Sequence, residues 1–247
     1  MIEALTFDVT HTLIHSPRVG EIYSEVLGRH GIAVEPGEAR RLISVVWQEL
    51  ACSADPGRDR WSAHPEGARG WWMRFLARFC EHLDVPTPSR FVAAELFHTF
   101  AAAPAWEVYP EVPRVLDELR GRGLRLGVIS NWDHRLPALL RELELGPRLE
   151  VIVFSSQVGV EKPDPRIFRH ALEVLAVEPA AVLHVGDSQL EDVEGATAVG
   201  MQALLCLRHG PPRGPAAAGG HVLRDLSPLP ELVASGALTT RAGRGSS

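Results

Sequence analysis

The sequence of 247 residues is 45% hydrophobic and 23% charged, with a formal net charge of −6. These values are typical of a soluble globular protein, and the length suffices for one large domain or for a core with a smaller insertion. The acidic balance argues against nucleic acid as a partner, and no apolar run approaches the ~20 residues that cross a bilayer.

Short apolar runs alternate with helical patterns along the chain. The runs predict strands at residues 4–7, 124–130, 151–154, 182–185, 202–205 and 221–223. Amphipathic helices are predicted over residues 111–122 and 166–175, where apolar side chains recur on one face. Strands that alternate with helices of this length predict βαβ units, and therefore an α/β fold with a parallel sheet.

Residues 16–105 follow a different pattern. They contain no convincing strand but several apolar helical faces, at residues 19–27, 42–50, 72–83 and 91–100. We therefore predict a core formed by residues 1–15 and 106–247, with an all-helical domain, residues 16–105, inserted after the first strand. Five of the six tryptophans fall in or at the edge of this insertion, where we interpret them as core residues.

Polar side chains follow four of the predicted strands at the point where each strand ends. Asp8 follows the first strand in "FDVTHTL", and later strands are followed by Ser130, Asn131, Lys162, Asp187 and Asp192. The carboxyl ends of parallel strands meet at one edge of a sheet, which is where ligands bind in doubly wound folds. Each residue alone is explained by a turn, a helix cap or a solvated surface. Together they predict one site.

This set of residues suits phosphoryl transfer. Asp8 is the candidate nucleophile, which attacks phosphorus and forms an aspartyl phosphate. Mg²⁺ held by Asp8 and Asp187, with Asp192 as a water-mediated ligand or an anchor, neutralises the phosphoryl charge. Ser130 and Lys162 bind the phosphoryl oxygens, and Lys162 keeps Asp8 ionised.

Four stretches carry a family resemblance. In chain order, "FDVTHTL", "VISN", "EKPDPRIF" and "HVGDSQLEDVEGATAVGM" resemble the four motifs of the haloacid dehalogenase-like hydrolase superfamily. The segments "ISNWD" and "GDSQLED" also resemble the subgroup called haloacid dehalogenase-like hydrolase domain-containing protein 3. The resemblance implies a three-layer Rossmann-like core, a mobile helical cap formed by the insertion, and Mg²⁺-dependent phosphatase activity. The expected substrate is a small phosphorylated metabolite.

Position 10 departs from the family pattern. Phosphatases of the family usually carry a second Asp there as general acid and base, whereas this chain has Thr10. Such help is typically worth ~10² to 10⁴ in rate, so slow turnover is expected. The backbone carbonyl of Thr10 still suits Mg²⁺, and Thr10 and Asn131 join Ser130 and Lys162 as predicted substrate-binding residues. His11, the nearest titratable group, either replaces the acid or packs in the turn.

Two other functions stay open. A 2-haloacid dehalogenase also uses an Asp nucleophile and needs neither a metal nor the second Asp, but Asp187 beside Asp8 would repel an anionic haloacid. A decayed, non-catalytic member of the family would bind a phosphorylated ligand or a protein partner. The intact Asp8, Lys162 and Asp187 argue against decay, because such a protein has no physical need for all three charges.

Selectivity, location and assembly are less closely tied to motifs. Selectivity is expected from the insertion, with four candidates: Arg58, Arg60, Trp61 and His64. Three widely spaced cysteines without a CxxC pair, and a start without a basic leader, favour a reducing cytoplasm. A monomer and a homodimer are both compatible with the sequence. Residues 208–221, rich in Pro and Gly, predict a loop, and residues 241–247 predict a frayed tail.

Overall fold

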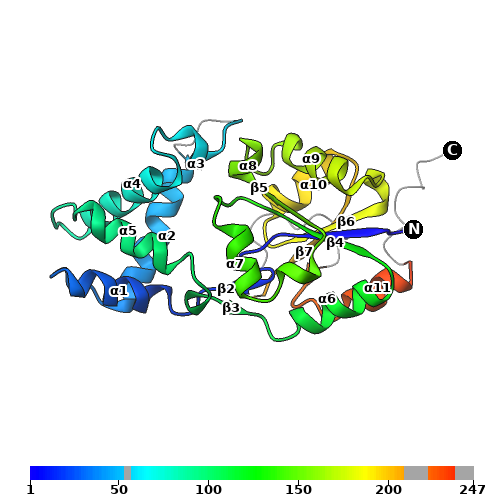
Figure 1. Ribbon diagram of the computed structural model, residues 1–247, viewed down its shortest axis with the longest axis horizontal. Helices are drawn as coiled ribbons and strands as arrows, with labels where there is room; N and C mark the ends of the chain where they lie inside the picture. The colour runs from blue at the N-terminus through cyan, green and yellow to red at the C-terminus, as the bar shows by residue number, and fades with distance from the viewer. Residues whose placement is uncertain (53–56, 209–221, 237–247) are drawn as a thin grey trace.

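The computed structural model describes residues 1–52, 57–208 and 222–236, which form a sheet with flanking helices beside a separate group of helices (Figure 1). Within these residues the main sheet has six strands, all parallel, in the order β5-β4-β1-β6-β7-β8. The strands are β1 (Ala4–Phe7), β4 (Arg125–Ser130), β5 (Val151–Phe154), β6 (Val182–Gly186), β7 (Gln202–Cys206) and β8 (Val222–Leu223). The predicted α/β fold with a parallel sheet is confirmed.

Helices cover both faces of the sheet, which is why its central strands are mostly apolar. One face carries α6 (Val112–Gly121), α7 (Leu136–Glu142) and α11 (Leu229–Ala234), and the other α8 (Ser155–Val158), α9 (Pro165–Leu175) and α10 (Gly195–Ala198) (Figure 1). Single 3-10 turns are η1 (Ala103–Ala105), η2 (Gly146–Arg148) and η3 (Pro179–Ala181). Leu5 and Phe7 of β1 join the hydrophobic cluster on the α6 face, and Ala4 joins that on the α9 face. The predicted three layers are confirmed.

The second group of helices forms what we call the helical module. It consists of α1 (Val19–Arg29), α2 (Pro36–Cys52), α3 (Arg60–Ala63), α4 (Gly67–His82) and α5 (Arg90–Thr99). These helices pack around a hydrophobic cluster of their own, in which Leu27, Phe75 and Phe79 are almost completely buried. The apolar faces predicted from the sequence are therefore the faces by which these helices pack together.

A short ribbon joins the module to the sheet. β2 (Ile14–His15) pairs antiparallel with β3 (Glu107–Val108), so the chain leaves and re-enters the core at one place. The rings of His15 and Tyr109 stack beside this pairing, with their centroids 4.4 Å apart. The ribbon was not predicted, because a strand of two residues is too short to show a periodic pattern.

Some expectations fall outside the described residues, namely the predicted tail at 241–247 and, apart from Arg208, the predicted loop at 208–221. Among the helices that are described, none is long and apolar enough to span a membrane. Cys80 and Cys206 are free and buried. Burial raises the pKa of both thiols to about 11, so they remain protonated at neutral pH.

Candidate active site

Asp8 lies at the carboxyl end of β1, with its side chain buried. Its Oδ1 accepts hydrogen bonds from Lys162 Nζ at 2.7 Å and from Ser130 Oγ at 3.1 Å. Ser130 ends the neighbouring strand β4, and Lys162 lies between α8 and α9. Three of the predicted site residues therefore meet, although Ser130 and Lys162 are 122 and 154 positions from Asp8 in the chain.

A second carboxylate holds the same lysine. Asp192, in the π-helix η4 (Gln189–Glu194), accepts from Lys162 Nζ at 2.5 Å, and its Oδ2 accepts from the Ser188 backbone N–H at 2.9 Å. His184 Nε2 lies 3.1 Å from Asp192 Oδ1, and its Nδ1 lies 2.9 Å from Thr6 Oγ1. His184 was not predicted as a site residue. The available signal was a polar residue inside the apolar run "VLHV", since a buried polar side chain requires a partner.

The charge of each group depends on its neighbours. Burial alone would lower the pKa of Lys162, but Asp192 and Asp8 raise it above its ordinary value, so the lysine stays a cation. Burial would raise the pKa of Asp192, yet Lys162 and His184 bring it below its ordinary value. Burial raises the pKa of Asp8, and Lys162 opposes that change. One buried cation thus faces two buried carboxylates.

Gly186 allows Asp192 to come this close to β6. A Cβ atom at position 186 would lie 2.1 Å from Asp192 Cγ and 2.2 Å from its Oδ2, far inside van der Waals contact. The glycine of the "GDSQLED" motif is therefore a packing requirement of the site as well as the end of a strand.

Asn131 fastens the backbone that carries Lys162. Its Oδ1 accepts from the Lys162 N–H at 2.6 Å, and its Nδ2 donates to the Lys162 carbonyl at 3.1 Å. Nδ2 also donates to Glu191 Oε2 at 3.2 Å. Asn131 was predicted to bind substrate. Its amide positions the lysine, and a direct contact with substrate stays a prediction.

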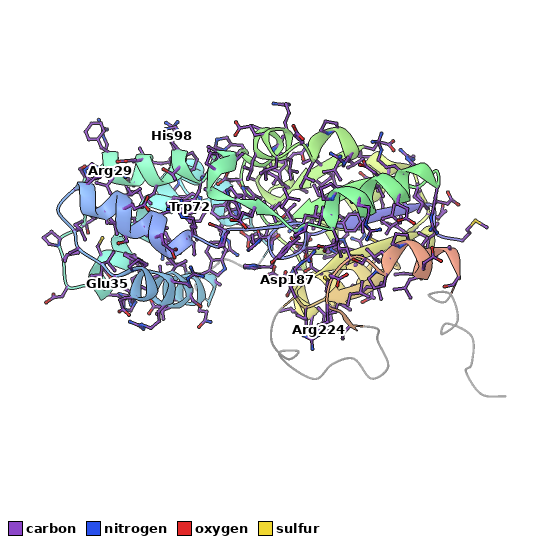
Figure 2. The ribbon with its side chains drawn as sticks, turned by 90° about the horizontal axis from the view of Figure 1, so that it is seen from below. Arg29, Glu35, Trp72, His98, Asp187 and Arg224 are labelled. Atoms are coloured by element: carbon purple, nitrogen blue, oxygen red, sulfur yellow. The ribbon has the colours of Figure 1, made fainter. Side chains whose placement is uncertain are left out.

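Asp187 and Glu191 add acidic groups to the same edge. Figure 2 shows Asp187 where the helical module meets the sheet. Burial, with the charges of Asp8 and Asp192, raises the pKa of Asp187 to about 8. Burial also raises the pKa of Glu191 to about 7, although Lys162 opposes it. The site therefore carries more potential negative charge than one lysine neutralises.

Two of these groups, Asp8 and Asp187, suit a hard divalent cation. Both offer carboxylate oxygens, and burial together with the negative charge of neighbouring carboxylates raises the pKa of each. Among the residues that the structure describes, no group of three or more His, Cys, Asp and Glu side chains is arranged to hold a metal ion. Carboxylate oxygens are ligands that hard cations such as Mg²⁺ accept.

The turn after Asp8 places Thr10 and His11 differently. Thr10 is half-buried and forms a single bridge with Ile14. The His11 N–H donates to the Ile14 carbonyl at 2.7 Å, and His11 has a φ of 64°, a left-handed conformation that few residues other than glycine adopt. The His11 side chain is exposed. Its backbone closes the turn, and its role as an acid stays a prediction.

The module residues predicted to govern selectivity are Arg58, Arg60, Trp61 and His64. Two of them contact the sheet side of the molecule. Arg60 donates through Nε and Nη2 to the carboxylate of Glu161, at 2.6 Å each. Trp61 Nε1 donates to Ser155 Oγ at 3.2 Å. The other two are an exposed arginine and a half-buried histidine, respectively.

Comparison with known proteins identifies the family. The profile described as haloacid dehalogenase-like hydrolase matches residues 2–200. The chain belongs to the haloacid dehalogenase-like hydrolase family. The resemblance inferred from the four motifs is thus confirmed. The mouse (Mus musculus) haloacid dehalogenase-like hydrolase domain-containing protein 3 is 36% identical, over 81% of this chain and 80% of its own.

Similar proteins with named activities include a phosphatase and a dehalogenase. The phosphoserine phosphatase of Thermus thermophilus is 37% identical over 65% of this chain and 66% of its own. The crystal structure of the 2-haloacid dehalogenase from Pseudomonas syringae pv. Tomato DC3000 has a TM-score of 0.66 and 24% identity. The alignment covers 95% of this chain and 99% of the dehalogenase. This second likeness shows a shared fold. The family is one of hydrolases, and this chain is a hydrolase of that family.

We expect Asp187→Asn to stabilise the metal-free protein at pH 8 and to have little effect at pH 4. The fold raises the pKa of Asp187 to about 8, whereas an unfolded Asp titrates near ~3.9. Between these values the folded state binds more protons than the unfolded state, so stability falls as pH rises. Asparagine removes this loss, which amounts to at most about 5 kcal/mol at pH 8 from these two pKa values.

Urea unfolding in EDTA at several pH values measures this difference. Asp117→Asn is the control, because Asp117 is exposed and pairs with Arg148 away from the site. A difference between wild type and Asp187→Asn that does not change with pH would contradict the environment assigned to Asp187.

Proposed function

We propose that the protein is a phosphatase of small phosphorylated metabolites that acts through an aspartyl phosphate on Asp8. The observation that carries this proposal is the buried amino group of Lys162, held between Asp8 at 2.7 Å and Asp192 at 2.5 Å. A cation at the nucleophile suits a phosphoryl group, whose oxygens carry the charge in the transition state. The 37% sequence identity with a phosphoserine phosphatase supports a phosphorylated metabolite as the substrate.

The proposed reaction has two steps. An oxygen of Asp8 attacks phosphorus; the bond to the alcohol oxygen breaks, and that oxygen leaves with the electron pair and takes up a proton. Water then attacks phosphorus, phosphate leaves and Asp8 is freed. Ser130 and Lys162 both donate to Oδ1 of Asp8. A phosphoryl group on the other carboxylate oxygen would therefore lie beside both donors.

Mg²⁺ is the cofactor we infer for this reaction. Asp8, Asp187 and the backbone carbonyl of Thr10 would hold it, and when bound it neutralises charge on the phosphoryl group. The raised pKa values of Asp8 and Asp187 support a cation at this place. Asp192 is engaged by Lys162 and by the Ser188 N–H. We therefore assign Asp192 to anchoring the lysine.

The helical module is the proposed cap of the site. Residues 16–105 would form this domain, inserted between the two parts of the core, residues 1–15 and 106–247. Both connections run through the β2–β3 ribbon, which supports a hinge there. Arg60 binds Glu161, next to Lys162 in the chain, so a seated cap brings module residues to the edge of the site.

Asp187 favours the phosphatase over a 2-haloacid dehalogenase. In the part of the chain that the structure describes, its carboxylate has no hydrogen-bonded or ion-paired partner, and it lies close enough to Asp8 for their charges to interact. Above its pKa of about 8 that charge would repel the carboxylate of a haloacid, whereas bound Mg²⁺ would neutralise it and favour a phosphoryl group.

A screen of phosphorylated metabolites and 2-haloacids, each with Mg²⁺ and with EDTA, tests the proposal. We expect phosphate release in Mg²⁺ and release of neither phosphate nor halide in EDTA. Halide release that EDTA does not affect would instead establish dehalogenation. Turnover of neither substrate class would favour a non-catalytic binding protein.

Asp187→Asn should weaken Mg²⁺ binding and phosphatase activity together. The substitution removes one of two proposed carboxylate ligands, so we expect the Mg²⁺ concentration for half-maximal activity to rise by roughly 10-fold or more. Titration calorimetry with Mg²⁺ and activity measured against Mg²⁺ concentration check this. An unchanged magnesium dependence would remove Asp187 from the proposed metal site.

The rate should depend strongly on the leaving group, because the hydroxyl of Thr10 cannot donate a proton reversibly near neutral pH. Nitrophenyl phosphate, whose leaving group needs no proton, should be cleaved much better than alkyl phosphates. Thr10→Asp should narrow this difference and raise alkyl phosphate turnover by roughly 10- to 1000-fold where protonation limits the rate. Steady-state kinetics on both substrate types measure the ratio.

His11→Ala tests whether His11 or water supplies the proton to the leaving group. A loss confined to alkyl phosphates would show that His11 supplies the acid. If wild type has no leaving-group preference and Thr10→Asp gains no activity, proton transfer by residue 10 does not limit the rate. Thr10 would then not explain slow turnover.

A further inference from the structure

The segment that follows β4 makes contacts in two directions. Ser130 and Asn131 bind Asp8 and the Lys162 backbone. A few residues later, Asp133 and Arg135 turn toward the helical module, and both are buried, with 1% and 8% of their surface exposed. Removing two charges from water is costly, and this cost is offset only where good geometry and further hydrogen bonds satisfy both groups.

Asp133 and Arg135 bind each other within one turn of chain. Arg135 donates through Nε to Asp133 Oδ1 at 2.8 Å, and through Nη2 to Oδ2 at 2.6 Å. The Arg135 backbone N–H also donates to Oδ1, at 3.1 Å. Burial would raise the pKa of Asp133, but Arg135 brings it below its ordinary value. Since the partners are two positions apart, the pair can form without the module.

Two helices of the module form hydrogen bonds with the Asp133–Arg135 pair. Trp72 Nε1, from α4, donates to Asp133 Oδ2 at 3.1 Å. Arg135 Nη1 donates to the carbonyl of Phe97, in α5, at 2.7 Å, and its guanidinium carbon lies 3.8 Å from the centre of the Phe97 ring. In Figure 2, Trp72 lies on the side of the module that faces the sheet. The pair therefore meets the module at one point with a donor, an acceptor and a cationic surface.

We propose that the Asp133–Arg135 pair is a docking site for the helical module. The pair forms without the module and stabilises the module in the position in which it contacts the sheet side, which we call its seated position. Asp133 and Arg135 are then positioning residues, which act through the module and through the loop they share with Ser130 and Asn131. When the module lifts, Trp72 leaves Asp133, and the pair keeps its internal bonds. The inference rests on the proposed role of the module as a cap, and it does not depend on which substrate is hydrolysed.

A second contact region gives the alternative. Arg60 and Glu161 also join the module to the sheet side, through an ion pair with 9% and 12% of the two side chains exposed. If this ion pair and the hydrogen bond from Trp61 to Ser155 seat the module, loss of the Trp72 hydrogen bond will not change the position of the module.

The test compares Trp72→Phe with Trp71→Phe in the full chain. Trp72→Phe keeps an aromatic ring and removes the N–H that binds Asp133. Trp71 is the matched control, because it lies in the same helix with its ring centroid 4.9 Å from that of Trp72. Its indole N–H makes no hydrogen bond to any residue that the structure describes.

Spin labels report the position of the module. They are placed at Phe91→Cys in α5 and Val174→Cys in α9, where the native side chains are 70% and 51% exposed. Cys52→Ser is added in every protein, while Cys80 and Cys206 are buried. Pulsed electron paramagnetic resonance then gives the distribution of distances between module and sheet, with no substrate present.

We expect one dominant distance between the two labels, that of the seated module, in wild type and in Trp71→Phe. Trp72→Phe should raise the population at longer distances by roughly 10-fold, the usual effect of a hydrogen bond to a charged group. Arg135→Lys keeps the charge but lacks the forked geometry that binds Asp133 and Phe97 together, so it should shift the distances in the same direction.

Two results would contradict the proposed docking of the module on Asp133 and Arg135. The first is a distance distribution for Trp72→Phe that matches Trp71→Phe, which would leave the contacts of Arg60 with Glu161 and of Trp61 with Ser155 to seat the module. The second is a lower urea midpoint for Trp72→Phe with no new distance population, which would mean a contribution to stability alone. Failure of the phosphatase proposal would appear in the metabolite screen and would leave these distances unchanged.

Discussion

The buried amino group of Lys162 is the interaction on which the rest of the site depends. It joins Asp8, from the end of β1, to Asp192, from the π-helix after β6, with side chains that are 10% exposed or less. Two carboxylates so close and so buried would repel each other without a cation between them. Removing one partner of such a group leaves an uncompensated charge, typically at a cost of about 3–5 kcal/mol. Correct placement of the lysine is therefore a condition for folding this edge as well as for chemistry.

Several unrelated parts of the chain serve to hold that lysine. Asn131 binds its backbone on both sides, and His184 supports Asp192 from within β6. Gly186 leaves the space that Asp192 occupies. Once these contacts are satisfied, Asp187 still has no ion-paired partner among the described residues. The same packing that stabilises one carboxylate pair thus leaves a place where a divalent ion would be favourable.

In the proposed reaction, binding of the phosphoryl group and protonation of the leaving group depend on different residues. The charged groups proposed to bind phosphate are all present and connected, whereas the position expected to carry an acid holds Thr10. The loop after β4 adds a second connection, because it carries Ser130 at one end and Arg135 at the other. Through that short segment, the position of the helical module and the surroundings of Asp8 share one piece of backbone.

The parallel sheet, the helical faces and the edge where the site lies could all be predicted from the sequence. Apolar runs of strand length predict strands with both faces covered, and the ends of such strands meet, so Asp8 and Lys162 were predictable neighbours. Their roles beyond that were decided by the tertiary structure. His184 supports Asp192 only because β6 buries its ring beside that carboxylate. The hydrogen bond between Trp72 and Asp133 joins residues 61 positions apart in the chain. A sequence pattern gives the face on which a side chain lies, but a hydrogen bond between two elements requires their distance and orientation, which only packing of the whole chain sets.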